Sequence, residues 1–294
     1  MSLLLPLLPL IAQVGPFATT PGAARSTPVE QGVERPKRRQ SRVIEGAAPA
    51  AAQPSSGKGK DCVAQVDEDA QSAAELAEDW LAGGAKGAGE QAEANLCLGL
   101  ARSRTGDWDE AEKAFIAGRD AAGADRMLRA RLGAMAGNAA LAGGANERAL
   151  VALDGAKGDA TGLADPALTT TIALDRARAL VALKRPVEAE AALAEARAAS
   201  PTNPEAWLLS ATLSRRQGHL AAAQSQIERA AELMPIDPAI GLEAGVIAVL
   251  SGHDEAARKS WQSVVAAAPD SPEAATAKGY LAQLGPAMGG GAKP

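Results

Sequence analysis

The sequence predicts an all-α protein, a right-handed superhelical solenoid built from helical hairpins. Alanine makes up about a quarter of the 294 residues and aromatic residues only 2%, a balance that favours closely packed helices over a β-sandwich. From residue 61 onward, turn residues separate helix-length apolar stretches. Prolines recur at a period of 34 in two series, Pro201, Pro235 and Pro269, and Pro204, Pro238 and Pro272. We therefore expect about five 34-residue hairpins, a degenerate N-terminal unit and a C-terminal closing helix.

Residues 1–24 contain an apolar stretch, Leu3–Val14, whose length suits the core of a secretory signal peptide. The stretch is too short to cross a bilayer as a helix, so we expect no integral membrane span. Against a signal peptide, no Lys or Arg precedes the stretch, and Pro6 and Pro9 interrupt it. The alternatives are an exported, periplasmic protein, which we favour, and a cytoplasmic protein with an apolar tail.

Residues 25–60 are rich in Pro, Ser, Gln and Gly, and we expect them to form a disordered linker. Residues 1–60 carry eight Lys and Arg against three Asp and Glu, a charge of +5, whereas the remainder carries −10. The basic run Arg35–Arg42 is a candidate localisation or nucleic-acid signal. Because the remainder is acidic and lacks an aromatic, basic surface for stacking bases, we favour a solvated linker and expect no nucleic-acid partner.

The unit at residues 204–237 shows why the period corresponds to a helical hairpin. Pro204 suits the first turn of a helix, because its missing N–H would be unpaired there. Gly218 ends that helix, since glycine adopts the left-handed conformation at little cost. A second helix is predicted over Leu220–Leu233, with small and aliphatic residues facing inward.

This arrangement resembles the tetratricopeptide repeat. In that family an aromatic residue on the first helix is followed by Ala, a large apolar residue and Pro in the second half of the unit. Trp207, Ala223, Ile227 and Pro235 occupy those positions here. The resemblance implies a non-catalytic scaffold that binds a protein or a peptide.

Other units follow the same pattern with departures. The expected hairpins cover residues 92–123, a longer unit around Leu132-Gly133, and residues 170–203, 204–237 and 238–271. Residues 157–167 have no helical signal and should break the period. We expect the degenerate unit over 61–91, the repeat domain with its closing helix over 92–285, and a disordered tail over 286–294.

The sequence contains none of the common catalytic motifs: no phosphate-binding loop, nucleophile elbow, zinc-binding H-E-x-x-H helix or C-x-x-C pair. His219 and His253 occupy the same slot of consecutive units, which places them about 10 Å apart, too far to share a metal ion. We therefore expect no enzyme, no metal site and no cofactor.

The resemblance also implies a partner site, because the first helices of successive units line a concave groove in this family. The positions that carry over to the groove are Leu174, Arg178, Leu208, Thr212, Arg215, Arg216, Leu242 and Val246. The leucines form an apolar strip, and arginine binds carboxylates through paired hydrogen bonds. We expect the groove to take an apolar segment bearing an acidic residue; the alternative is that the arginines only aid solubility.

Two other functions stay open at this point. The chain could be a structural or envelope-assembly component tethered through its N-terminal segment. It could also be the repeat module of a larger catalytic assembly, although the lack of a reactive constellation counts against activity of its own.

The two cysteines, Cys62 and Cys97, allow two arrangements. On one uninterrupted helix over 61–82, Cys62 would lie about 21 Å from Cys97, too far for a disulfide. If the acidic residues Asp67–Asp69 instead mark a new helix start, the cysteines occupy near-equivalent slots of adjacent first helices. We favour this second arrangement and a bridge, which requires an oxidising compartment. The alternative is two unpaired buried thiols in a cytosolic protein.

Overall fold

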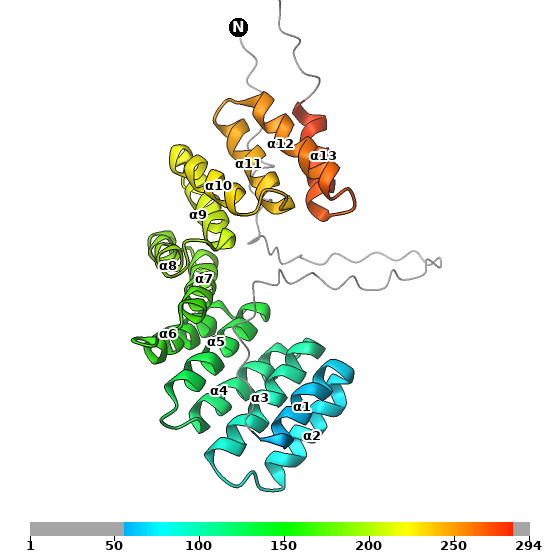
Figure 1. Ribbon diagram of the computed structural model, residues 1–294, viewed down its shortest axis with the longest axis vertical. Coiled ribbons are helices and arrows are strands. Elements are labelled where there is room, and N and C mark those ends of the chain that lie inside the picture. Colours follow the sequence, from blue (N-terminus) through cyan, green and yellow to red (C-terminus); the bar gives the residue numbers. More distant parts are fainter. Residues whose placement is uncertain (1–55, 285–294) are drawn as a thin grey trace, which may run out of the picture. The chain divides into compact units, whose positions relative to one another are not determined.

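The computed structural model describes residues 56–284, and the regular structure of this part is helical throughout (Figure 1). The all-α solenoid predicted from the sequence is confirmed. The expectations for residues 1–24, for 25–55 of the linker and for 286–294 lie outside the described residues. The described helices are α1 (Gly57–Glu68), α2 (Ala70–Ala82), α3 (Ala88–Thr105), α4 (Trp108–Ala121), α5 (Arg126–Ala142), α6 (Asn146–Ala160), α7 (Pro166–Ala182), α8 (Pro186–Ala199), α9 (Pro204–Arg216), α10 (Leu220–Leu233), α11 (Pro238–Leu250), α12 (Asp254–Ala267) and α13 (Pro272–Leu284).

Consecutive helices pack in hairpins, α1 with α2 and so on to α11 with α12, and α13 packs against both helices of the last hairpin. The second helix of each hairpin also packs against the first helix of the next. First helices meet directly as well: α1 contacts α3, α5 contacts α7, and α9 contacts α11. Each hairpin therefore buries its apolar faces against its neighbours, the arrangement that stabilises repeat proteins.

Short polar residues followed by proline start the later first helices. The side chains of Asn203 and Asp237 each accept a hydrogen bond from the backbone amide three residues on, at 3.0 and 2.9 Å. Asp165 and Ser271 do the same at 3.0 Å. In all four cases proline occupies the first helical position, where its fixed φ favours the helix and its missing N–H costs nothing. This local signal explains why the proline period marks the helix starts.

From the α3–α4 hairpin to the α11–α12 hairpin, the turn between the two helices uses a residue in the left-handed conformation. Gly218 (φ 80°) and Gly252 (φ 78°) hold this position in the two most regular units. In the 170–203 unit it is held by Lys184 (φ 59°), the one non-glycine residue with positive φ among residues 56–284. The turn geometry is therefore kept even where the preferred residue is absent.

Helix α6 extends further than the sequence predicted. It continues to Ala160, through four residues of the 157–167 stretch that was expected to be irregular. Ala156 and Ala160 are buried against the start of α7, in a cluster that includes Leu168 and Ile172. Burial of these small side chains keeps this segment helical although Gly158 lies within it.

Helix α1 begins at Gly57, so residues 57–60, assigned above to the linker, are helical. The hydroxyl of Ser56 accepts a hydrogen bond from the Gly59 amide at 2.9 Å and so caps the helix. The backbone amide of Ser56 donates to the carboxylate of Glu93 on α3, at 3.1 Å. This tertiary contact fixes the start of α1, and no local sequence pattern predicts the contact.

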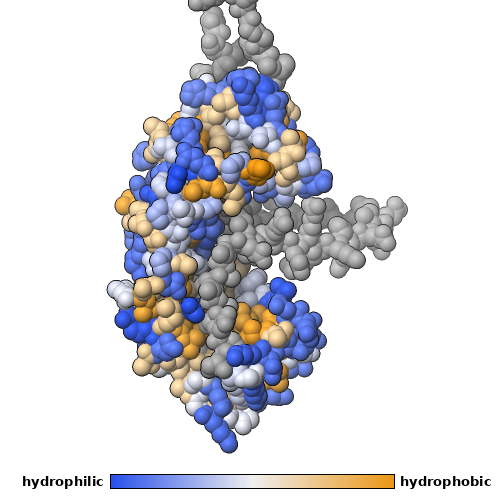
Figure 2. Space-filling view, in the orientation of Figure 1, coloured by the Kyte–Doolittle hydropathy of each residue, from blue (hydrophilic) through white to orange (hydrophobic). Residues whose placement is uncertain are grey.

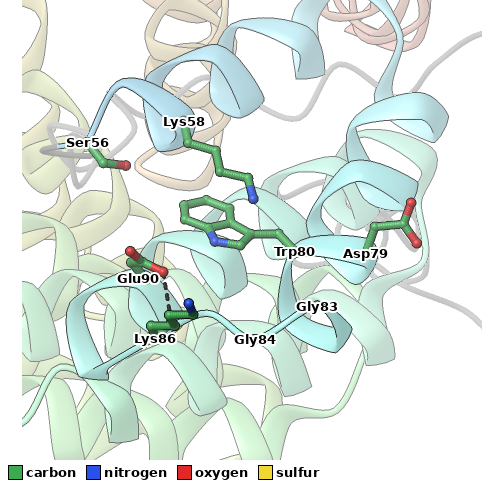
Figure 3. A pocket seen from close by; sticks show the side chains of 8 residues that line it. All are labelled: Ser56, Lys58, Asp79, Trp80, Gly83, Gly84, Lys86 and Glu90. Atoms are coloured by element: carbon green, nitrogen blue, oxygen red, sulfur yellow. Dashed lines mark hydrogen bonds between the residues drawn. The ribbon is translucent and has the colours of Figure 1, made fainter.

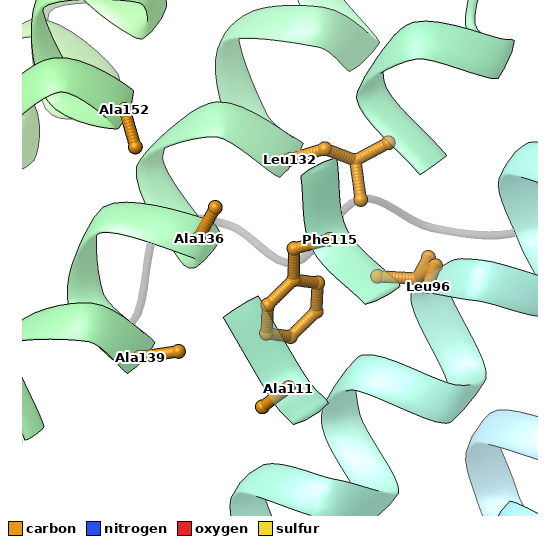
Figure 4. Close-up of a cluster of buried hydrophobic side chains, with 7 residues drawn as sticks. All are labelled: Leu96, Ala111, Phe115, Leu132, Ala136, Ala139 and Ala152. Carbon is orange, nitrogen blue, oxygen red and sulfur yellow. The ribbon is translucent and has the colours of Figure 1, made fainter. Parts of the chain in front are cut away.

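The core clusters combine a few large apolar side chains with several alanines. Figure 4 shows the cluster in which Phe115 of α4 projects toward small and aliphatic residues of α3 to α6, namely Leu96, Ala111, Leu132, Ala136, Ala139 and Ala152. Gly99 of α3 lies against the ring: a Cβ atom placed on Gly99 would come within 2.5 Å of it. Glycine is therefore required for this close approach of α3 and α4.

Candidate interaction face

The predicted groove residues lie on three first helices, α7, α9 and α11, as their 34-residue spacing implies. Leu174 on α7 is 3% exposed, and Leu242 and Val246 on α11 are each 9% exposed. Leu208 on α9 is half-buried and packs against the cluster that contains Ile240. The apolar strip expected from the sequence is therefore mostly covered, and Leu208 is its most accessible leucine.

Ion pairs join these first helices to one another. Arg178 of α7 donates to Asp175 on its own helix and to Glu205 at the start of α9. Arg215 at the end of α9 donates to both carboxylate oxygens of Glu243 on α11, at 2.6 and 3.2 Å. Charge-assisted pairs of this geometry hold neighbouring helices in register.

The Arg215–Glu243 pair corrects the expectation that Arg215 takes an acidic residue of a partner. The side chain of Arg215 is 3% exposed and that of Glu243 is 8% exposed, so their pair is closed to a ligand. Arg178 already contacts two carboxylates of the chain. Among the predicted arginines only Arg216 is exposed, at the C-terminal end of α9.

The cluster around Arg178 carries an excess of negative charge. Burial raises the pKa of the Asp175 carboxyl above its ordinary value, and the nearby Arg178 guanidinium only partly offsets this. Burial also raises the pKa of Glu205, with Arg178 opposing the shift and the Asp175 charge adding to it. Asn138 of α5 donates to Asp175 at 3.5 Å. Two carboxylates thus share one guanidinium across α7 and α9.

Thr212 lies on the same face of α9 as Glu205 and Leu208, since residues seven apart are two helical turns apart. Its side chain is 1% exposed, and its hydroxyl has no hydrogen-bond partner within the part of the chain that the structure describes. A buried hydroxyl without a partner is uncommon in folded proteins. We name Asp175, Arg178, Glu205, Leu208 and Thr212 the inner patch.

A cavity of about 280 Å³ lies at the N-terminal hairpin, and its lining residues are distant in the sequence from the inner patch. Its lining residues are Ser56, Lys58, Asp79, Trp80, Gly83, Gly84, Lys86 and Glu90. In Figure 3 the Trp80 ring lies below the Lys58 ammonium, which is 4.7 Å from the ring centroid, and the Glu90 carboxylate accepts a hydrogen bond from the Lys86 amide at 2.8 Å. The lining mixes both signs of charge and pairs no nucleophile with a base, so it indicates no particular ligand.

Cys62 and Cys97 are brought together in the structure. Helix α1 ends at Glu68, and Asp69 caps α2 by accepting hydrogen bonds from the Gln71 and Ser72 amides. This break makes α1 a first helix lying beside α3, the second of the two arrangements considered above. The two sulfurs form a disulfide with a Cα–Cα distance of 6.0 Å, and both residues are fully buried.

From the sequence we also expect no metal site and no integral membrane span. His219 and His253 are exposed residues that precede α10 and α12. Within residues 56–284 no group of three or more His, Cys, Asp or Glu side chains could hold a metal ion. None of the helices in this part of the chain is both long and apolar enough to cross a bilayer. On the face shown in Figure 2, apolar residues are interspersed with polar ones.

The hairpin stack and the register of its first helices define a helical-repeat protein of the α-solenoid class. A family model described as tetratricopeptide repeat matches residues 171–213, which include the inner patch. No curated protein sequence matches the chain. The resemblance stated from the sequence is confirmed: the chain carries the tetratricopeptide repeat.

Solved structures with the same fold are distant in sequence. MamA (residues 41 to the end) from Desulfovibrio magneticus RS-1 has a TM-score of 0.53 at 17% identity, covering 62% of this chain and 98% of that one. PilF of Pseudomonas aeruginosa has a TM-score of 0.58 at 13% identity, covering 76% and 97%. A tetratricopeptide repeat protein from Parabacteroides merdae has a TM-score of 0.56 at 16% identity, covering 66% and 73%. At these identities the likeness is one of fold.

Burial of the Asp175 carboxyl predicts a pH-dependent effect of Asp175→Asn. Because the native state raises the pKa of Asp175, it binds the proton more tightly than the unfolded chain, and ionisation above the ordinary value of 3.8 opposes folding. The free energy of unfolding of the wild type, minus that of the variant, should therefore decrease as the pH rises. Urea unfolding of both proteins at pH 4 and pH 7 measures this difference, and an increase with pH would contradict the assignment.

Proposed function

We propose that the protein is a non-catalytic scaffold that binds a peptide or protein segment across the inner faces of α7, α9 and α11. The tetratricopeptide-repeat fold is that of protein-interaction scaffolds, which supports a protein partner. The observation that carries the proposal is the pair of inter-helix bridges, Arg178 to Glu205 and Arg215 to Glu243. They fix three first helices as one continuous surface before any partner arrives, and preorganisation lowers the cost of binding.

Leu208 is the residue through which this surface is tested most directly. It is the accessible member of the apolar strip, so Leu208→Asn should weaken peptide binding at least about tenfold, because it places an uncharged polar amide against apolar surface. Val187→Asn is the matched control, since Val187 is 76% exposed on α8, outside the inner patch. Peptides selected on the immobilised full-length protein from a random dodecapeptide library, then measured by fluorescence anisotropy, provide the readout.

The milder variant Leu208→Ala and thermal melting by circular dichroism separate lost binding from lost folding. If selected peptides bind the Leu208 variants as well as they bind the wild type, the partner does not lie on this surface, and the proposal is wrong.

We infer that the protein works in an oxidising compartment. The N-terminal hairpin packs through small side chains, Ala73, Ala74, Ala77 and Ala101, which bury little apolar area each. A bridge between Cys62 and Cys97 compensates for that weak packing by about 2–4 kcal/mol in the chain-entropy description. Stable disulfides of this kind belong to extracellular, periplasmic or similar compartments.

Thiol counting tests the compartment. Protein purified without reductant from its native cell and then denatured should show no free thiol, and a sample treated with reductant should show two. Two free thiols in the untreated sample would contradict both the bridge in the cell and the inferred compartment.

A further inference from the structure

We propose that the segment bound by the inner patch carries a Lys or Arg side chain, held by the carboxylate of Glu205 beside Asp175. The inference rests on the proposed function and names the chemistry of the partner. It reverses the acidic partner expected from the sequence. The partner we commit to is a basic, partly apolar segment of another protein.

The inner patch carries more negative than positive charge. Asp175 and Glu205 contribute two negative charges, and Arg178 is the one cation bonded to them. Asp175 is 3% exposed and closed to a ligand, but the side chain of Glu205 remains 20% exposed and that of Arg178 26% exposed. The excess charge is therefore reached from outside through Glu205, and a second cation there would complete the pairing.

The unpaired hydroxyl of Thr212 indicates a ligand independently of charge. This hydroxyl is buried and lacks a partner among the described residues. It lies two turns of α9 beyond Glu205, about 10 Å along the helix axis. An extended segment covers that length in about three residues. A segment that places its cation at Glu205 therefore passes Leu208, and it reaches the Thr212 hydroxyl, which can donate or accept a hydrogen bond, when the side chains that cover this residue move aside on binding.

The other charged residues of the inner face do not pair with Glu205. Arg215 and Glu243 neutralise each other in a buried pair. Arg216 lies eleven residues after Glu205, about 16 Å along α9. Among the described residues, no cation other than Arg178 lies within bonding distance of the Glu205 carboxylate. The preference for a basic side chain is therefore local to the α7–α9 junction.

Peptide selection on the full-length protein tests the inference. A random dodecapeptide phage library is panned on the immobilised protein, and the recovered peptides are synthesised and measured by fluorescence anisotropy. We expect recovered peptides to be enriched in Lys and Arg next to an apolar residue. Replacing the cation by Gln should weaken binding about tenfold, the effect of one lost charge-assisted hydrogen bond.

Protein variants complete the test. Glu205→Gln should weaken the basic peptides about tenfold, and its fold should persist because Arg178 keeps its bond to Asp175. Thr212→Val should weaken them less, since it removes one neutral hydrogen bond. Glu232→Gln is the matched control, because Glu232 is an exposed member of an ion pair on α10 and should leave binding unchanged.

The outcomes separate the two proposals. Peptides that depend on Leu208 but are acidic or uncharged, or that bind Glu205→Gln unchanged, overturn the inference and leave the proposed function standing. Recovery of no peptide, or of peptides that ignore Leu208, contradicts the proposed function and this inference with it.

Discussion

Close contact between a glycine on one helix and a large side chain on its partner is the interaction on which the stack depends. A Cβ atom on Gly99 would lie 2.5 Å from the Phe115 ring, and one on Gly137 would lie 2.4 Å from Leu153. On Gly245 it would lie 2.1 Å from Trp261, whose indole N–H donates to the Leu242 carbonyl at 3.1 Å. These pairs set how closely the helices of three hairpins approach, and packed interiors do not absorb even one added methyl group freely.

The inner face lies on α7, α9 and α11, and of the hairpins that carry it α11–α12 has such a glycine contact. First helices held at a fixed separation can exchange ion pairs, and the Arg178–Glu205 and Arg215–Glu243 pairs do so across successive hairpins. The second pair is balanced and closed, whereas Asp175 leaves the first with one carboxylate in excess. The inner face thus carries an excess of negative charge at one junction, and this excess comes from packing as much as from composition.

Local signals explain what the sequence predicted well. A polar cap followed by proline starts a helix by itself, and a left-handed glycine ends one, so the bounds Leu220–Leu233 of α10 agree with the prediction. The misjudged features depend on distant residues. The partners of Arg178 and Arg215 lie 27 and 28 residues away, and the Glu93 contact at Ser56 spans 37. The sequence does not distinguish an arginine that is available to a partner from one that is already paired with a carboxylate of the chain. The charges available on the inner face could therefore be assigned only from the structure.

A double-mutant cycle between Gly99 and Phe115 tests the packing constraint most directly. Gly99→Ala should lower the free energy of urea unfolding by about 1–3 kcal/mol, because the added methyl group clashes with the ring. In a Phe115→Leu background, where the ring is gone, the same substitution should cost much less, giving a coupling of about 1 kcal/mol or more. Gly89→Ala, at an open position of α3, should not destabilise the protein. Equal costs of Gly99→Ala in the two backgrounds would contradict the account.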